Sequence, residues 1–592
     1  MVFLSGRLEL MVDPQLFTLE DSYFDDAYEI DVTDFTGKIT GSNNRSVLLG
    51  VYRYLREIGF AFLRPDRDGE RVPEKIGPHT VKLREAASNR YRGICIEGSV
   101  SYENILQFVD WMPKVGLNTY FTQFQIPYEF FKTWYEHRNN PLHEKEAVPT
   151  EEETGVFIRE ILVPHMKKRG LIWQAAGHGF TASAAGITAT GWDEVDESRI
   201  EGLNFDYLAE IDGKRGLFQG VPLNTNLCYS NPKVREKMVE GVMKYLEENP
   251  DVDILHFWLA DGSNNSCECS ACAAKRPSDW YVMMLNQLDE KLSKAGSRVK
   301  IVFLGYVDLL WPPVEEKIKN PDRFLFMYAP ITRSYGRSLP TEQSGEIWPF
   351  ERNHCRFPVD AGETMRFYHA WKQCFSGESF LYDYHYMWNH FRDWGDYGSA
   401  RILWEDLVKL KELGFDGYVS CQQTRVFSPT GFGMYVLAAT LWDRSRTFDQ
   451  LGEEYFNLLF KDAGERVYEY CRRLSELSYE EQPESDGPGI SRDAAEKLEK
   501  AAALVEEFLS FFEEKYSEQV SEDRTSWKYL LYSGRAARIY FDVLKYRRLG
   551  DEEKSAAEYV RLKEYLCETE DEWQEGFDVY WFIKKMDQVL GK

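Results

Sequence analysis

The chain has 592 residues, too many for one hydrophobic core, so we expect two to four domains. It carries 71 Lys and Arg residues against 97 Asp and Glu residues, a net charge of −26, which disfavours nucleic acid as a partner. No segment approaches the run of about 20 apolar residues that spans a bilayer, so no membrane partner is expected.

The opening stretch MVFLSGRLELMVDPQ lacks the long apolar run and the small-residue cleavage site of a signal peptide. The ten cysteines are scattered apart from one cluster, which favours a reducing compartment over a disulfide framework. We therefore expect a cytoplasmic protein.

Residues 1–87 are predicted to form a small α+β domain. The stretches DDAYEIDVTD and GKITGSNN read as short strands, and SNNRSVLLGVYRYLREIGFAFL reads as a helix. Ser42 or Asn43 can cap this helix, and Gly59 ends it. Its apolar residues recur on one face, which must be buried against a neighbour.

Residues 88–445 alternate apolar β-like runs with amphipathic helices. Eight such runs begin with YRGICIEG and end with DGYVSCQQ. This pattern predicts an α/β fold, a (β/α)8 TIM-like barrel with insertions. A doubly wound open sheet is the alternative, but it would more often carry a Gly-rich phosphate loop after its first strand, and ICIEGSVSYEN is not one.

Residues 446–592 are predicted to form an α-helical C-terminal domain, interrupted by a polar linker at 480–489. Nothing in its pattern indicates chemistry of its own. Its helices could form the interface of a homo-oligomer or a lid, and the pattern does not decide between the two.

In a barrel of this kind, the reacting groups lie at the carboxyl ends of the strands. Applied to the eight predicted strands, this rule selects four carboxylates, Glu97, Asp261, Asp308 and Asp383. It also selects side chains that we expect to bind substrate, namely Arg92, His178, Tyr306, Tyr328, Arg333, Tyr384, His385, Trp388 and Gln423. One such residue often only caps a helix or fills a core, but several acidic and aromatic groups at one rim favour a functional site.

Several motifs carry a resemblance to known families. RSVLLGVYRYLREIGFAFLRPDRDGERVPE resembles the end of the small domain that precedes the barrel in bacterial alpha-glucuronidases and family 20-type hexosaminidases. YRGICIEG, GHGF, LCYSNP, ADGSNNSCECSAC, YAPITRSYG and SPTGFGMYVLAATLWD together resemble the bacterial family called domain of unknown function 4838. This resemblance spans residues 30–460 and implies a glycoside-hydrolase-like barrel that acts on or binds carbohydrate.

The resemblance also implies catalytic roles. Family 20-type enzymes end the fourth strand with an Asp-Glu pair, but here Gly262 follows Asp261, so the position of the acid is empty. Alpha-glucuronidases pair a strand-four acid with carboxylates from later strands. Similarity to them implies Asp261 as general acid and Asp383 as base or nucleophile, with Glu97 in reserve. One carboxyl must stay protonated near neutral pH while the other stays ionised.

Three cysteines follow the fourth strand with the spacing Cys267-x-Cys269-x-x-Cys272. Zn²⁺ takes four tetrahedral ligands, and Cys228 is the best candidate for the fourth, with Cys355 second. The cluster is either a closed structural zinc site that pins the loop after Asp261, an open site that activates water, or a set of reduced cysteines. No organic cofactor is expected.

Together these patterns predict a glycoside hydrolase that cleaves oligosaccharides or glycoconjugates by carboxylate acid/base chemistry. Aromatic residues make up 15% of the chain, and rings of this kind can cover the apolar face of a sugar. Two alternatives are a carbohydrate-binding protein without catalysis and a Zn-dependent hydrolase or lyase with an open metal site.

Overall fold

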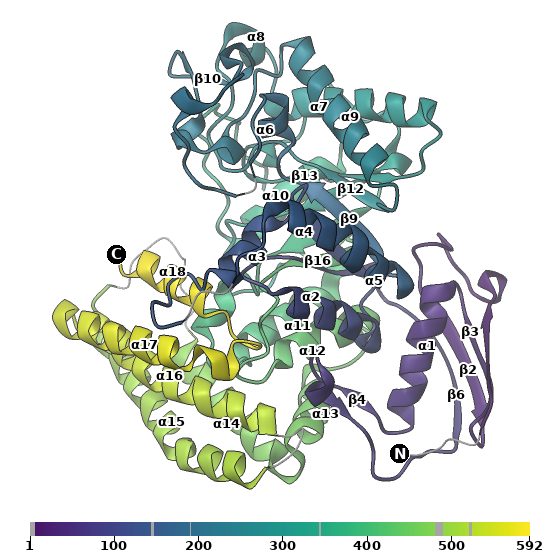
Figure 1. The fold of residues 1–592 in the computed structure, drawn as a ribbon, viewed down its shortest axis with the longest axis vertical. Helices are drawn as coiled ribbons and strands as arrows, with labels where there is room; N and C mark the ends of the chain where they lie inside the picture. Colours follow the sequence, from purple (N-terminus) through teal and green to yellow (C-terminus); the bar gives the residue numbers. More distant parts are fainter. Residues whose placement is uncertain are drawn as a thin grey trace.

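The computed structural model describes residues 6–143, 147–189, 191–342, 345–479, 489–519 and 524–591. All but the last residue of the predicted linker at 480–489 lie outside these ranges. A small sheet domain, a closed barrel and a group of C-terminal helices follow one another along the chain (Figure 1). In Figure 1 the sheet domain lies to the right and the C-terminal helices lie at the lower left.

The N-terminal domain is a four-stranded sheet with a helix packed against it. Its strands lie in the order β1-β3-β2-β6, with bounds β1 Leu8–Val12, β2 Ala27–Thr33, β3 Thr36–Gly41 and β6 Thr80–Ala86. Helix α1 (Asn44–Glu57) begins after Asn43, one of the two predicted caps, whose side chain accepts a hydrogen bond from the Ser46 N–H. The apolar face of α1 shares a buried cluster with strands β2, β3 and β6.

Eight parallel strands close into a barrel, which confirms the predicted (β/α)8 fold. They are β7 Tyr91–Cys95, β8 Thr119–Gln123, β9 Ile172–Gly177, β12 Ile254–Phe257, β13 Lys300–Gly305, β14 Phe324–Tyr328, β15 Ser379–Asp383 and β16 Gly417–Cys421. Neighbours in the ring follow chain order, and β16 pairs with β7 to close it. Each strand lies inside one of the eight predicted apolar runs, because strands covered on both faces need apolar side chains on both.

Helices surround the barrel. They are α2 Tyr102–Trp111, α3 Tyr128–Tyr135, α4 Glu151–Phe157, α5 Val163–Lys168, α6 Phe180–Ala184, α7 Pro232–Glu248, α8 Ser270–Ala273, α9 Pro277–Lys294, α10 Ala361–Lys372, α11 Gly398–Leu413 and α12 Phe432–Trp442. A long insertion between α6 and α7 holds the hairpin of β10 (Glu210–Ile211) and β11 (Lys214–Arg215). This insertion and α8 lie at the top of Figure 1.

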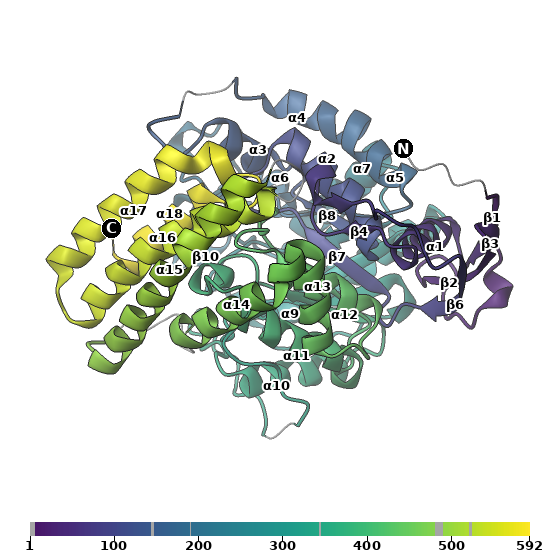
Figure 2. The same ribbon diagram turned by 90° about the horizontal axis from the view of Figure 1, so that it is seen from below.

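The C-terminal region is helical. Its helices are α13 Phe448–Phe460, α14 Gly464–Ser478, α15 Arg492–Glu518, α16 Arg524–Arg548, α17 Glu552–Trp573 and α18 Val579–Val589. Helix α16 packs against both α15 and α17. Helices α15, α16 and α17 lie together at the left of Figure 2. Across the described ranges, every helix is too short or too polar to cross a bilayer.

A buried ion network joins the N-terminal domain to the barrel. The Asp26 carboxylate accepts hydrogen bonds from Arg45 Nε at 2.9 Å and from Arg92 Nη2 at 2.6 Å. Burial works against ionisation, yet the two guanidinium groups hold the pKa of Asp26 well below its usual range. The predicted substrate-binding role of Arg92 is therefore wrong. It is the second residue of β7, so it lies at the amino end of the strand, whereas Glu97 follows the carboxyl end.

Candidate active site

A cavity lies at the carboxyl ends of the barrel strands. Its empty volume is about 940 Å³, which includes space open to solvent. Residues predicted from the sequence line it, namely Glu97, His178, Asp261, Cys267, Cys272, Tyr306, Asp308 and Tyr384. They follow strands β7, β9, β12, β13 and β15, so the closure of the barrel is what brings them together.

Glu97 is a buried carboxyl group with one free oxygen. Only 2% of the residue is exposed. Its Oε2 accepts a hydrogen bond from Gln123 Nε2 at 2.5 Å, whereas its Oε1 has no partner among the described residues. Burial, with a smaller contribution from the negative charge of Asp261, raises the pKa of Glu97 from 4.5 to about 7. A carboxyl that keeps its proton near neutral pH can act as a general acid.

Asp261 lies in a polar environment. Its Oδ2 accepts a hydrogen bond from Trp192 Nε1 at 2.8 Å. Its Oδ1 accepts from the Tyr306 hydroxyl at 2.9 Å and from the Gly262 N–H at 2.8 Å. Three donors and no acceptor are the surroundings of an ionised carboxylate, which can only accept. Two carboxyl groups of the cavity, Glu97 and Asp261, thus lie in contrasting environments.

Aromatic rings form much of the cavity wall. They come from Trp192, Tyr229, Trp258, Trp280, Tyr306, Tyr382 and Tyr384. The His178 ring meets that of Trp258 edge to face at 4.7 Å. Gly177 precedes His178 with φ of +94°, and a Cβ there would come within 3.0 Å of the Trp258 ring, which explains this glycine. Burial lowers the pKa of His178 in spite of Asp261, so its ring can serve as a neutral hydrogen-bonding group.

The cavity has little positive charge. Among the described residues that line it, Arg352 is the one Lys or Arg side chain. Its guanidinium group donates to the backbone oxygens of Cys267 at 3.0 Å, Cys272 at 3.2 Å and Lys275 at 2.6 Å. These bonds occupy the guanidinium group, so it is committed to the loop after Asp261.

The expectation that Asp383 faces the cavity is wrong. Strand side chains alternate, and its neighbours Tyr382 and Tyr384 line the cavity, so Asp383 projects toward the surrounding helices. There its Oδ2 accepts from Arg333 Nη2 at 2.8 Å, and the same nitrogen donates to Asp406 of α11 at 2.6 Å. His385 Nε2 lies 3.2 Å from Asp406, and all four side chains are fully buried.

This buried group, defined by Arg333, Asp383, His385 and Asp406, is an ion cluster outside the cavity. Burial opposes charge on Arg333, but Asp383 and Asp406 raise its pKa well above the usual range. The predicted substrate contacts of Arg333 and His385 are therefore wrong as well. The guanidinium group supplies the cation that balances the two carboxylates.

Three further predicted contacts also lie outside the cavity lining. Tyr328 alternates with Met327 and Ala329, which line the cavity, so its hydroxyl instead donates to the Thr364 oxygen at 2.5 Å. Gln423 donates through Nε2 to the Met387 oxygen at 2.6 Å. Trp388 stacks on Tyr384, which does line the cavity, with a centroid distance of 6.1 Å.

Two cavity residues that donate hydrogen bonds to the carboxyl groups of Glu97 and Asp261 escaped the sequence prediction. Gln123 ends strand β8, and the strand-end rule could have selected it. Trp192 belongs to the long insertion, where no periodicity marks it, and only the folded chain brings it to Asp261. The C-terminal region also contributes, because Asp578 accepts from the Ser99 N–H at 2.8 Å and pairs with Arg425 at 3.0 Å, next to the Glu97 loop.

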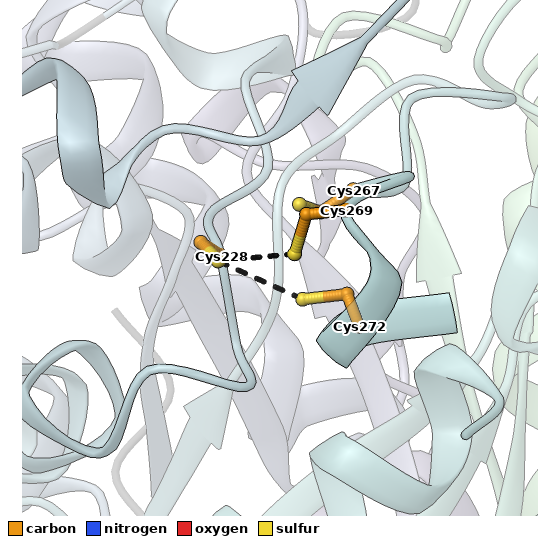
Figure 3. A group of neighbouring side chains, drawn as sticks. All are labelled: Cys228, Cys267, Cys269 and Cys272. Atoms are coloured by element: carbon orange, nitrogen blue, oxygen red, sulfur yellow. Dashed lines mark hydrogen bonds between the residues drawn. The ribbon is translucent and has the colours of Figure 1, made fainter. Parts of the chain in front are cut away.

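The four cysteines predicted as metal ligands converge (Figure 3). The sulfur atoms of Cys228, Cys267, Cys269 and Cys272 all lie within 4.8 Å of one another. Cys228 comes from the segment before α7, and the others come from the loop after Asp261 and from α8. The second candidate, Cys355, is not part of this group, because its thiol donates to the Glu351 oxygen at 3.2 Å.

Comparison with solved structures defines the class of the fold. The chain is similar to a family GH115 4-O-methyl-alpha-glucuronidase with specificity for decorated arabinogalactans, with 13% identity and a TM-score of 0.56 over 94% of this chain and 70% of that one. It is also similar to a family 89 glycoside hydrolase from Clostridium perfringens in complex with its substrate GlcNAc-alpha-1,4-galactose, with 11% identity and a TM-score of 0.51 over 95% of this chain and 63% of that one. The protein thus has a glycosidase-like fold.

The sequence itself matches one family. Residues 204–472 match the family described as Domain of unknown function (DUF4838). The match confirms the resemblance from LCYSNP onward, whereas YRGICIEG and GHGF precede the matched region. No curated protein matches the sequence.

Proposed function

We propose that the protein is a glycoside hydrolase in which Glu97 is the proton donor and Asp261 is the ionised carboxylate. The observation that carries this proposal is the contrast between the two groups in one aromatic-lined cavity. Glu97 is buried with a pKa of about 7, and Asp261 is held by three hydrogen-bond donors. Cleavage of a glycosidic bond requires such a pair.

In the proposed reaction, Glu97 donates its proton to the glycosidic oxygen as the bond to the anomeric carbon breaks. Positive charge develops on the sugar ring, and Asp261 stabilises it either as nucleophile or through an activated water. The hydroxyl of the attacking water ends on the anomeric carbon. Its proton passes to the ionised Glu97 if Asp261 is the nucleophile, and to Asp261 if Asp261 activates the water, in which case Glu97 recovers a proton from solvent. Gln123, which binds Oε2, keeps the carboxyl oriented with Oε1 free for this transfer.

The charge of the cavity favours a neutral sugar. A uronic acid would need a free cation beside its carboxylate. Arg352 is committed to backbone oxygens, Arg333 lies in the buried ion cluster, and His178 favours its neutral form. Together with the negative charges of the cavity, this supports an uncharged glycoside rather than a glucuronide as substrate.

A panel of nitrophenyl glycosides and nitrophenyl uronides tests the proposal. We expect turnover of at least one neutral glycoside and none of the uronides. Asp261→Asn should lower turnover at least about 10²-fold, Glu97→Gln should lower it less the better the leaving group, and Glu236→Gln on the exposed face of α7 should leave it unchanged. Sugar binding without turnover by the wild-type protein would instead support a carbohydrate-binding role. Turnover that survives both active-site substitutions would refute the catalytic assignment.

A further inference from the structure

We propose that Cys228, Cys267, Cys269 and Cys272 bind one Zn²⁺ in a closed structural site that joins the insertion before α7 to the loop after Asp261. This inference goes beyond the proposed glycosidase activity and does not depend on it.

The spacing of the sulfur atoms fits a tetrahedral thiolate site. The Cys228 sulfur lies 3.7 Å from that of Cys269 and 3.8 Å from that of Cys272. Zn–S bonds of about 2.3 Å in a tetrahedron place the sulfur atoms about 3.8 Å apart. A disulfide would need about 2.05 Å, so these sulfur atoms are not bonded to each other. The geometry matches metal ligation.

The surroundings of the sulfur atoms suit thiolates. The backbone N–H of Glu210 donates to the Cys267 sulfur at 3.3 Å, and that of Ser230 donates to the Cys272 sulfur at 3.3 Å. Such donors orient metal-bound cysteines and disperse their charge. The positively charged Arg215 of β11 also lies beside the cluster, within side-chain hydrogen-bonding range of Cys228 and Cys269.

The four ligands come from two separate segments, so a bound ion would cross-link them. Asn265, which lies between Asp261 and Cys267, already bridges the same segments. Its Nδ2 donates to the oxygens of Asn224 at 2.7 Å and Asp261 at 2.8 Å. The zinc would reinforce this bridge and hold the insertion, which carries Trp192, against the loop that carries Asp261.

The set of four thiolate ligands indicates a structural rather than a catalytic ion. Four protein thiolates complete the tetrahedral shell and leave no position for water or substrate. Cys267 and Cys272 nevertheless line the cavity, so the ion would stiffen one wall of the proposed active site. This argues against the alternative of an open zinc site.

Metal analysis of the reduced full-length protein tests the site directly. We expect one zinc per chain and its loss in Cys228→Ser and Cys269→Ser. Cys374→Ser, which alters an exposed cysteine outside the cluster, should keep the full amount. Cobalt added to the zinc-free protein should produce the absorption of a tetrahedral thiolate complex, and Cys228→Ser should not. The proposal would be overturned if the protein bound neither zinc nor cobalt, if it contained iron in place of zinc, or if Cys228→Ser kept its full zinc content.

Hydrogen exchange separates the proposed cross-link from a general effect on folding. Removing zinc with a chelator should raise amide exchange in residues 221–231 and 262–275, while the barrel strands keep their protection. Uniform loss of protection, or no change in these two segments, would contradict the cross-link. These readouts do not use activity, so failure of the zinc site and failure of the glycosidase assignment are distinguishable.

Discussion

Replacing Glu97 by glutamine should affect stability and catalysis in opposite directions. The carboxyl holds its proton more tightly in the folded chain, because burial raises its pKa from 4.5 to about 7. The stability that this proton contributes is fully present below pH 4.5 and is lost as pH rises through about 7, a difference of about 3 kcal/mol. Glutamine is neutral at every pH. Glu97→Gln should therefore gain up to about 3 kcal/mol over the wild type above pH 7 and nothing below pH 4.5.

Denaturant unfolding at pH 4.5 and pH 8 measures this gain in stability. Turnover measures the accompanying loss of catalysis. For a glycoside with a poor leaving group, Glu97→Gln should lose about 10²–10⁴-fold in kcat/KM. A dinitrophenyl leaving group needs no proton, so its cleavage should be largely retained, and the fall in activity above pH 7 should disappear. Destabilisation at both pH values, or equal losses with both leaving groups, would refute the role of Glu97 as acid.

Four other substitutions test the proposed active site and the buried ion cluster. Asp261→Asn should lower kcat/KM at least about 10²-fold with both leaving groups, because the carboxylate acts whichever group departs. Trp192→Phe removes one hydrogen bond to that carboxylate and should cost about 10-fold in kcat, with unchanged thermal unfolding. Asp383→Asn should lower the free energy of unfolding by about 3–5 kcal/mol, with unchanged kcat/KM for the folded fraction. Asp578→Asn should lower kcat and increase hydrogen exchange at Ser99, since it frees the loop beside Glu97.

A matched control accompanies the Asp383 variant. Asp31 pairs with Lys82 at 3.0 Å with both side chains 62% exposed, and Asp31→Asn should cost no more than about 1 kcal/mol. A folded Asp383→Asn protein without turnover would mean that Asp383 reaches the substrate and that the cavity is wrongly assigned. Unchanged turnover in Asp261→Asn would contradict the carboxylate pair.

The difference between Asp261 and Asp383 shows where prediction from sequence ends. Both follow an apolar run, and the strand-end rule selects both. Whether a side chain enters the barrel or faces the helices depends on the alternation of the strand, and in YDYHYMW tyrosines alternate with the polar Asp383 and His385. Polarity alone selects Asp383 and His385 as cavity residues, and this selection is wrong. Both belong to the buried ion cluster, which needs charged groups as much as a cavity does.

The sequence by itself determined the eight strands, the helices around them and the cluster of Cys267, Cys269 and Cys272, because apolar periodicity and close spacing are local properties of the chain, whereas the fold brings Cys228 to the cluster. Only the tertiary structure decided which carboxyl keeps its proton. Burial of Glu97 depends on strands and loops far apart in the sequence, and so do the donors that surround Asp261. The pKa of a carboxyl follows from its solvation and neighbouring charges, and these exist only once the barrel has closed.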